Sequence, residues 1–506
     1  MGFVEFVAQI MKALNIDILL VVATFCDQST LCMLTGTCKT LYRTAARYAL
    51  SERAVSLDSD RAVELFLRFM RPQNGERWRL LRTLTIQTEL LGRPDIAKAL
   101  ASSIRKATNL EDLELVPAEV ILGSHPDLGP AFASLPKVKY VGIAGANGLT
   151  CRMFEEMRWP LETAVIERTS IDTSWQESDW DENEAIHPVE LCKNACDTLK
   201  SLDLDGWLVW DFRLPGVPVY PKLDSLTVTG CYCPPTAPWA TAFPNLSYLE
   251  VLTIEHACSD FSEETLEAHL DTREENREEH LSRGTWNELA MFKGAALDLY
   301  LVGIPCPIRH LELGISRKEL RFLGAALSNA RPTTLDLDIS TTMFTGGDNG
   351  WLLEHLRNPS LSTVRVLILR IWLHMPSTAD VPDFLTCLNN ALTSLRLESL
   401  SLHIKLENYS AGLYLSECSS DEDSAGDTRS RRPARVGSPT TPPCATEVYM
   451  STQDVYALAH RFLEASESLQ NVDVNVEFWR NSDYTDKHIR MTRSDHCASV
   501  CDRASF

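Results

Sequence analysis

Closely spaced cysteines are the residues of this chain that could bind a metal ion. Fifteen cysteines occur in 506 residues, with close pairs at Cys192/Cys196, Cys231/Cys233 and Cys497/Cys501. Tetrahedral zinc needs four ligands, and a fourth is not evident even where His496 adjoins the last pair. We therefore expect reduced, mostly buried thiols and no metal site.

The sequence also lacks motifs that carry catalysis. It has no G-x-x-x-x-G-K-[ST] phosphate loop, no H-E-x-x-H and no G-x-S-x-G, and the glycines at 346–350 lack the spacing of a dinucleotide turn. Its twelve histidines are dispersed without a local carboxylate or thiol pattern. We expect a non-catalytic protein without cofactors, although groups that converge only in three dimensions stay open.

Composition and charge narrow the class of partner. Hydrophobic residues make up 44% and charged residues 23% of the chain, so a large folded core is expected. The net charge of −21 argues against nucleic acid and favours basic partner surfaces. The apolar stretch Ile18 to Cys26 is much shorter than the roughly 20 residues that span a bilayer. We expect no membrane partner and a cytoplasmic or nuclear location, or both.

Apolar spacing predicts three short helices before residue 57. Asn15 or Asp17 can cap the first, and Thr30 can cap a second that Gly36 and Thr37 interrupt. The predicted apolar positions are Ile18, Val22 and Phe25 in the first helix, Leu31 and Leu34 in the second, and Cys38, Leu41, Tyr42, Ala45 and Ala49 in the third. Three helices of this size have too little interior to bury all these side chains, which is typical of a docking module.

Within residues 14–50 the sequence resembles the F-box family. The matching positions are Leu14, Asp17, Ile18, Leu19 and Val22, then Thr30, Leu31, Leu34, Thr37, Cys38, Lys39 and Leu41. The phrase TCKTLY before a basic helix is similar to fungal F-box proteins, whereas Asn15 stands where the family usually has proline. The resemblance implies that a Skp-type adaptor binds Leu14, Ile18, Leu19, Val22, Leu31, Leu34, Cys38 and Leu41. The alternative is a helical cap on the repeats that follow.

From residue 81 onward the pattern L-x-x-L-x-L, with aliphatic variants, recurs along the chain. Copies start at Leu81, Leu110, Val138, Leu161, Leu199, Leu223, Leu246, Ile308, Leu335, Leu361, Leu392 and Leu469. Each copy predicts a half-buried strand, and helical faces lie between them, such as Ile96/Leu100/Ile104, Leu320/Leu323/Leu327, Phe384/Leu388/Leu392 and Val455/Leu458/Phe462. This predicts an α/β fold: an irregular leucine-rich-repeat solenoid whose curved, mostly parallel sheet has helices on its convex side. An ordinary doubly wound sheet is the alternative.

Residues between the leucines should face the concave surface of such a solenoid. Many of them are acidic, including Asp203, Asp205, Glu250, Glu312, Asp336 and Asp338, with Arg365 and Arg396 towards the C-terminal end. We hypothesise that these carboxylates bind a basic segment of a client protein. The alternative is that they are polar only because exposed strand positions usually are.

The predicted organisation is a helical module at 1–57, a repeat domain at 58–480 and a flexible tail at 481–506. The repeat domain has an acidic insertion at 170–190, a solvated helix at 263–280 and a disordered insertion at 407–447. The family resemblance implies a substrate-recognition subunit of an SCF-type E3 ubiquitin ligase, joined through the adaptor to a cullin. The alternatives are an F-box scaffold outside ubiquitination and a repeat-only binding protein with a helical cap.

Overall fold

The computed structural model describes residues 16–26, 28–37, 39–89, 91–168, 188–207, 218–231, 239–253, 263–339, 343, 354–374, 380–407, 445–480 and 483–495. These residues form two compact units, here called unit 1 (Met1–Asp260 with Glu278–Trp286) and unit 2 (Phe261–Arg277 with Asn287–Phe506). Almost all of the predicted insertions at 170–190 and 407–447 lies outside the described residues, as do Leu14, Cys38, Cys497 and Cys501.

Unit 1 begins with three helices, α2 (Ile16–Phe25), α3 (Gln28–Thr37) and α4 (Lys39–Ser51). Ala23 of α2 and Leu31 of α3 are fully buried together. Two expectations are corrected here, because α3 starts before Thr30 and continues through Gly36. A glycine inside a helix costs only about 1 kcal/mol, which the packing of α3 on α4 can offset.

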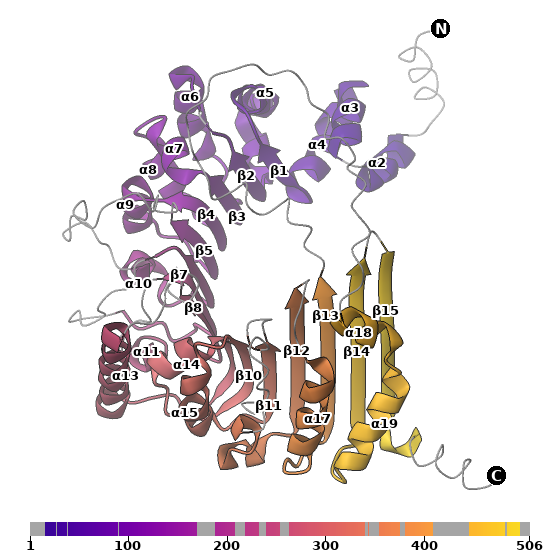
Figure 1. The fold of residues 1–506 in the computed structure, drawn as a ribbon. Coiled ribbons are helices and arrows are strands. Elements are labelled where there is room, and N and C mark those ends of the chain that lie inside the picture. The colour runs from indigo at the N-terminus through magenta and orange to yellow at the C-terminus, as the bar shows by residue number, and fades with distance from the viewer. Residues whose placement is uncertain are drawn as a thin grey trace, which may run out of the picture. The chain divides into compact units, whose positions relative to one another are not determined.

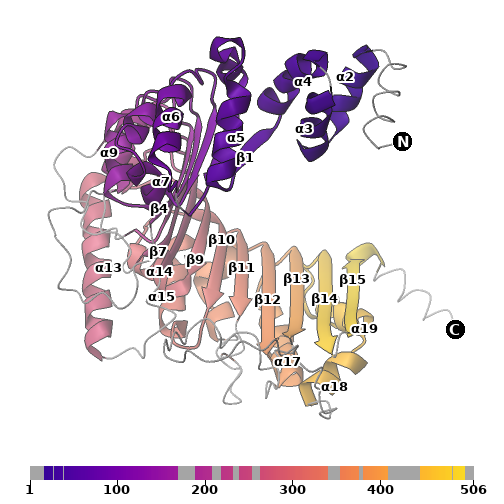
Figure 2. The same cartoon turned by 90° about the horizontal axis from the view of Figure 1, so that it is seen from above.

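The rest of unit 1 repeats a strand followed by helical turns (Figures 1 and 2). Its strands are β1 (Ala54–Leu57), β2 (Thr83–Gln87), β3 (Asp112–Val116), β4 (Tyr140–Ala146), β5 (Thr163–Arg168), β6 (Ser201–Asp205), β7 (Ser225–Cys231) and β8 (Tyr248–Thr253). Its helices are α5 (Asp60–Met70), η1 (Gln73–Leu80), α6 (Pro94–Ile104), α7 (Ala118–Gly123), α8 (Leu128–Ala133), α9 (Gly148–Glu156), α10 (Pro188–Leu191), η4 (Lys193–Ala195) and α11 (Trp239–Ala242).

In unit 1 each strand pairs in parallel with the next strand of the chain. A doubly wound sheet reverses its strand order part-way and carries helices on both faces. The strand order of unit 1 does not reverse, and α6 to α9 lie along one face of its sheet (Figure 1). The sheet is therefore compatible with the predicted solenoid-like repeat and not with the doubly wound alternative.

Unit 2 continues the same alternation of strand and helix. Its strands are β9 (Leu289–Ala295), β10 (Ile308–Ile315), β11 (Thr334–Ile339), β12 (Val366–His374), β13 (Ser399–Glu407), β14 (Asn471–Arg480) and β15 (Asp483–Thr492). Its helices are α14 (Ala296–Val302), α15 (Leu320–Ala330), η6 (Pro359–Thr363), α17 (Val381–Leu392), α18 (Ala445–Thr452) and α19 (Val455–Ala465), and α13 (Glu263–Arg283) contributes its first part. Neighbours from β9 to β14 are parallel, and β15 is antiparallel to β14.

Several segments differ from the sequence-based expectations. Residues 483–492, placed in a flexible tail, form β15. Leu392 ends α17 instead of starting a strand, and β13 begins at Ser399, because Leu392 completes the buried face of the helix. The strands β1 and β9 were not predicted. The helix α13 is not solvated on all sides, because Asn276 is buried and its amide donates to the Leu301 carbonyl at 2.7 Å.

The apolar rows of the sheet form the core of each unit. In unit 1 one row of registered side chains runs through Leu84, Leu113, Val141, Ala164, Leu202, Leu226 and Leu249, and none is more than 2% exposed. The helices bury their predicted faces, such as Ile96, Leu100 and Ile104 of α6. Because side chains alternate along a strand, the residues between these leucines lie on the opposite face of the sheet.

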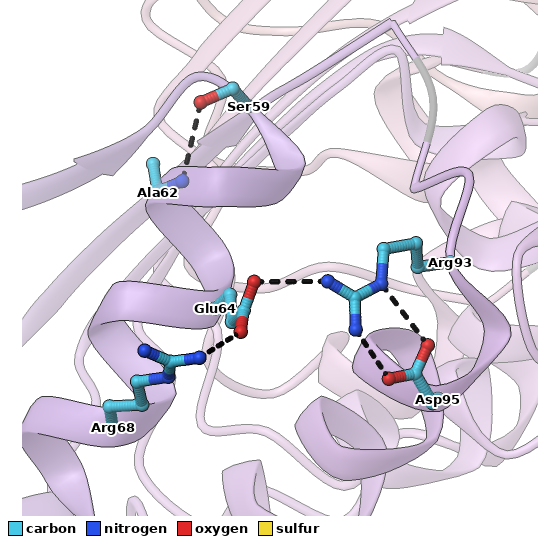
Figure 3. Close-up of polar contacts among 6 residues, drawn as sticks. All are labelled: Ser59, Ala62, Glu64, Arg68, Arg93 and Asp95. Carbon is cyan, nitrogen blue, oxygen red and sulfur yellow. Dashed lines mark hydrogen bonds and ion pairs between the residues drawn. The ribbon is translucent and has the colours of Figure 1, made fainter.

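Polar contacts join α5 to the start of α6 (Figure 3). Ser59 caps α5 by accepting from the Ala62 amide at 3.3 Å. Glu64 of α5 pairs with Arg68 and with Arg93, which in turn pairs with Asp95 of α6. This chain of ion pairs holds the start of α6 beside α5, although such exposed pairs contribute little free energy each.

Candidate partner-binding surfaces

The three N-terminal helices expose large apolar side chains. Ile18, Val21, Val22 and Phe25 of α2 are 52%, 58%, 44% and 84% exposed, and Met33 of α3 is 64% exposed. These five residues are called the apolar helix surface below. The helix α2 (IDILLVVATF) is apolar on nearly every side, so packing Leu19 and Ala23 inward leaves its other side chains outward. On α2 the exposed residues Ile18, Val21, Val22 and Phe25 follow helical spacing and so share one face, and such a group of exposed apolar side chains marks a site of interaction.

The residues predicted to contact an adaptor do not all lie on this surface. Ile18 and Val22 do, and Leu34 is half-buried. In contrast, Leu19, Leu31 and Leu41 are at most 6% exposed, so in this structure they pack the helices together. Val21, Phe25 and Met33 were not among the predicted adaptor contacts. The spacing of Val21 and Phe25 alone could not separate them from Leu19, because α2 is apolar on nearly every side.

A buried arginine joins the N-terminal helices of unit 1 to the first helices of its repeat. Arg77, 1% exposed, donates to the carbonyls of Phe69 at 2.7 Å and Tyr42 at 2.9 Å. Its guanidinium also lies over the Tyr42 ring, 4.0 Å from the centroid. Because Tyr42 belongs to α4 and Phe69 to α5, charge-assisted hydrogen bonds and a cation–π contact hold α4 to α5 and η1.

The polar face of the unit 1 sheet is acidic. The positions between the buried aliphatic residues of each strand are called interleaved positions. Six carboxylates lie at the interleaved positions of β3, β5, β6 and β8, and together they are called the acidic face: Asp112, Glu114, Glu167, Asp203, Asp205 and Glu250. Glu114, Asp203 and Glu250 lie in one registered row that continues through Thr85, Gly142, Val165 and Thr227. Within the described strands β2 to β8, no lysine or arginine occupies an interleaved position of this face.

Hydroxyl groups donate hydrogen bonds to two of these carboxylates. Thr85 donates to Glu114 at 2.9 Å, and Tyr248 donates to Glu250 at 2.6 Å. Burial raises the pKa of Asp203 above its ordinary value, and the negative charges of Glu250 and Asp205 raise it further. Burial and nearby carboxylates likewise raise the pKa of Tyr140. Among the described strand residues, the acidic face therefore gathers carboxylates without an interleaved lysine or arginine.

The corresponding face of unit 2 is mixed in charge. Arg370 of β12 forms ion pairs with Asp336 at 2.6 Å and with Glu312 at 3.4 Å. Asp336 is 1% exposed, and burial raises its pKa to about 6 despite the opposing effect of Arg370. Glu312 and Asp336 were predicted to bind a client, but here their charge is partly neutralised by an arginine that the sequence motif did not single out.

A small hollow lies further along the same face of unit 2. Its volume is about 200 Å³, and its polar lining comes from β12, β13 and β14: Arg370, Trp372, His403, Lys405, Asn475 and Glu477. The Lys405 ammonium lies 4.5 Å from the centroid of the Trp372 ring. Arg370 and Lys405 thus outnumber Glu477 here, which distinguishes this face from the acidic face of unit 1.

Buried cysteines of the described chain are poorly suited to nucleophilic chemistry. Burial raises the pKa of Cys192 to about 12 and the pKa values of Cys151 and Cys306 to about 11. Since the thiolate is the reactive form, these side chains stay protonated at neutral pH. Among the described helices, none has the length and apolar character needed to cross a bilayer.

Neither a comparison with models of protein families nor a search of curated proteins found a match to this chain. The resemblance within residues 14–50 therefore rests on the residues of this chain alone.

Proposed function

We propose that this chain is the substrate-recognition subunit of an SCF-type E3 ubiquitin ligase. The observation that carries the proposal is an apolar helix surface joined to a sheet with a polar face. The helices would bind a Skp-type adaptor and, through it, a cullin, and the sheet would bind the client. Such a receptor breaks no bond itself, because it acts by bringing a client lysine close to the charged enzyme.

The adaptor side of the proposal is supported by the exposure of α2 and α3. An interface draws most of its free energy from a few large apolar or aromatic side chains in its centre. Phe25, Val22 and Met33 supply such side chains on adjacent short helices. The resemblance to the F-box family, with Asp17, Ile18 and Lys39 at matching positions, indicates which class of protein would cover them.

The client side is supported by the acidic face of unit 1. Six carboxylates without an interleaved lysine or arginine favour a lysine- or arginine-rich segment, because unlike charges speed association and select the partner. The sequence-based hypothesis named carboxylates of both units. The ion pairs of Arg370 favour placing the basic client segment on unit 1.

Ubiquitin transfer separates this function from a scaffold outside ubiquitination. The full chain would be combined with a Skp-type adaptor, a cullin, a RING subunit and a charged ubiquitin-conjugating enzyme. We expect a complex containing all subunits, with ubiquitin linked to a bound client or to the chain itself. A stable complex without ubiquitin transfer would indicate the scaffold, and the absence of any complex would indicate a repeat protein with a helical cap.

The client surface is tested with a fluorescent oligo-arginine peptide. Replacing Asp112, Glu114, Asp203 and Glu250 by their amides should weaken binding about tenfold and flatten its dependence on salt. The matched control replaces four exposed carboxylates elsewhere, namely Asp127, Glu156, Asp197 and Glu464. Equal losses in the two variants would show that only net charge matters and would remove the acidic face as the client site.

A further inference from the structure

Three side chains with metal-binding groups converge on the polar face of unit 2. His310 and Glu312 are two residues apart on β10, so they project from the same face. Asp336 of β11 is the registered neighbour of Glu312. One ligand atom from each of the three side chains lies within 4.8 Å of the other two. The two paired strands thus fix the positions of an imidazole and two carboxylates.

Two of these side chains carry buried polar atoms that lack a hydrogen-bond partner. The atoms are His310 Nε2 and Asp336 Oδ1, and Asp336 as a whole is only 1% exposed. Leaving such an atom unpaired destabilises the folded state, so buried polar groups in folded proteins are nearly always satisfied. Unsatisfied atoms on two neighbouring metal-binding side chains therefore point to a ligand between them.

The charge around the cluster leaves room for a cation. The carboxylates of Glu312, Asp336 and Asp338 outnumber the guanidinium of Arg370 and the ammonium of Lys293, which lies beside Glu312 on β9. Arg370 reaches Asp336 Oδ2 and Glu312 Oε1, so Asp336 Oδ1 and the imidazole remain available. A bound cation would give both Asp336 Oδ1 and the His310 imidazole a partner.

We propose that His310, Glu312 and Asp336 bind one first-row divalent cation, such as Mn²⁺ or Zn²⁺. Imidazole together with carboxylate is a donor set for these ions, whereas Ca²⁺ and Mg²⁺ take oxygen ligands. Water would fill the remaining positions from the polar side of the sheet. The cation would join β10 to β11 and stabilise unit 2 by mass action. This inference does not rest on the proposed ligase function.

Mn²⁺ is the appropriate probe, because the chain's fifteen cysteines would compete for a softer ion. The full chain would be titrated with Mn²⁺, and free Mn²⁺ would be followed by electron paramagnetic resonance. We expect one ion bound per chain and a higher melting temperature in its presence. Binding should weaken about tenfold or more in His310→Ala, since even the loss of an outer-shell partner can cost this much.

Two further variants keep the test decisive. Glu312→Gln preserves shape and should also weaken binding, which covers the case that His310→Ala fails to fold. His403→Ala removes another histidine of the same face, one whose ring contacts Ser401 and lies outside the cluster, and should bind as the unaltered chain does. The proposal is overturned if the unaltered chain binds Mn²⁺ no better than Glu312→Gln, or if His403→Ala loses as much.

Discussion

At the scale of single residues, the acidic face retains charge at a cost to stability. Asp203 is half-buried, and burial raises its pKa above the ordinary 3.8, with Glu250 and Asp205 adding to the effect. The folded chain therefore prefers the protonated carboxyl more than the unfolded chain does. The free energy of unfolding should fall as the pH rises from the ordinary pKa of Asp203 through its raised pKa in the folded chain. It should stay lower at higher pH. Groups with shifted pKa values gather at functional sites, which agrees with the role proposed for this face.

Asp203→Asn tests this reasoning directly. The amide removes the cost of a desolvated negative charge, so the denaturation midpoint at pH 7 should rise relative to the unaltered chain. The gain should disappear below the ordinary pKa, where Asp203 is protonated in both states. Chemical denaturation at several pH values measures it, with the exposed Asp197→Asn as control. A gain in stability that does not depend on pH would contradict the view that the buried charge of Asp203 destabilises the fold.

At the scale of elements, the alternation of leucines predicted most of the strands but not all of them. The interleaved pattern in β2, β3 and β6 to β8 is regular, so both the strand and its buried face follow from the sequence. The strand β1 is too short for the motif, and β9 (LAMFKGA) lacks the second aliphatic residue at the required spacing. The strand β15 is polar, and its pairing with β14 provides the order that its own sequence does not indicate.

The attachment of α4 depends on Arg77, which no periodicity could predict because its partners are backbone carbonyls. We expect Arg77→Met to lower the free energy of unfolding by about 2 kcal/mol, since hydrogen bonds from a charged group contribute about 1.5–3 kcal/mol. Hydrogen exchange in residues 39–51 should become faster. The exposed Arg79→Met is the matched control. Unchanged exchange in α4 would show that apolar packing alone holds the helix.

At the scale of the whole molecule, the sequence predicted the class of fold better than which side chains are exposed on its candidate surfaces. Strand order and the buried rows follow from repeated local patterns. The apolar helix surface does not follow from such patterns. Leu19 and Val22 are both aliphatic, and they differ in burial only because α3 and α4 pack on one side of α2. The contact of Arg370 with Glu312 and Asp336 joins three strands far apart in the chain, so it depends on their registration.

The structure also changes how the docking hypothesis is best tested. Removing the first 55 residues would delete Tyr42, which contacts Arg77, and part of β1, which pairs with β2. The loss of binding in such a truncation could therefore come from damage to the sheet. A single charge on the apolar helix surface avoids this difficulty, because Val22 is already 44% exposed.

The affinity of the full chain for a recombinant Skp-type adaptor, measured by isothermal titration calorimetry, is the most direct test. We expect the unaltered chain to bind and Val22→Asp to bind at least about 30-fold more weakly, because burying an unpaired charge at the centre of an interface costs about 2 kcal/mol or more. Leu281→Asp, which places the same charge on an exposed residue of α13, should bind normally. Absence of binding by the unaltered chain, or equal binding by Val22→Asp, would contradict a receptor that docks through α2 and α3.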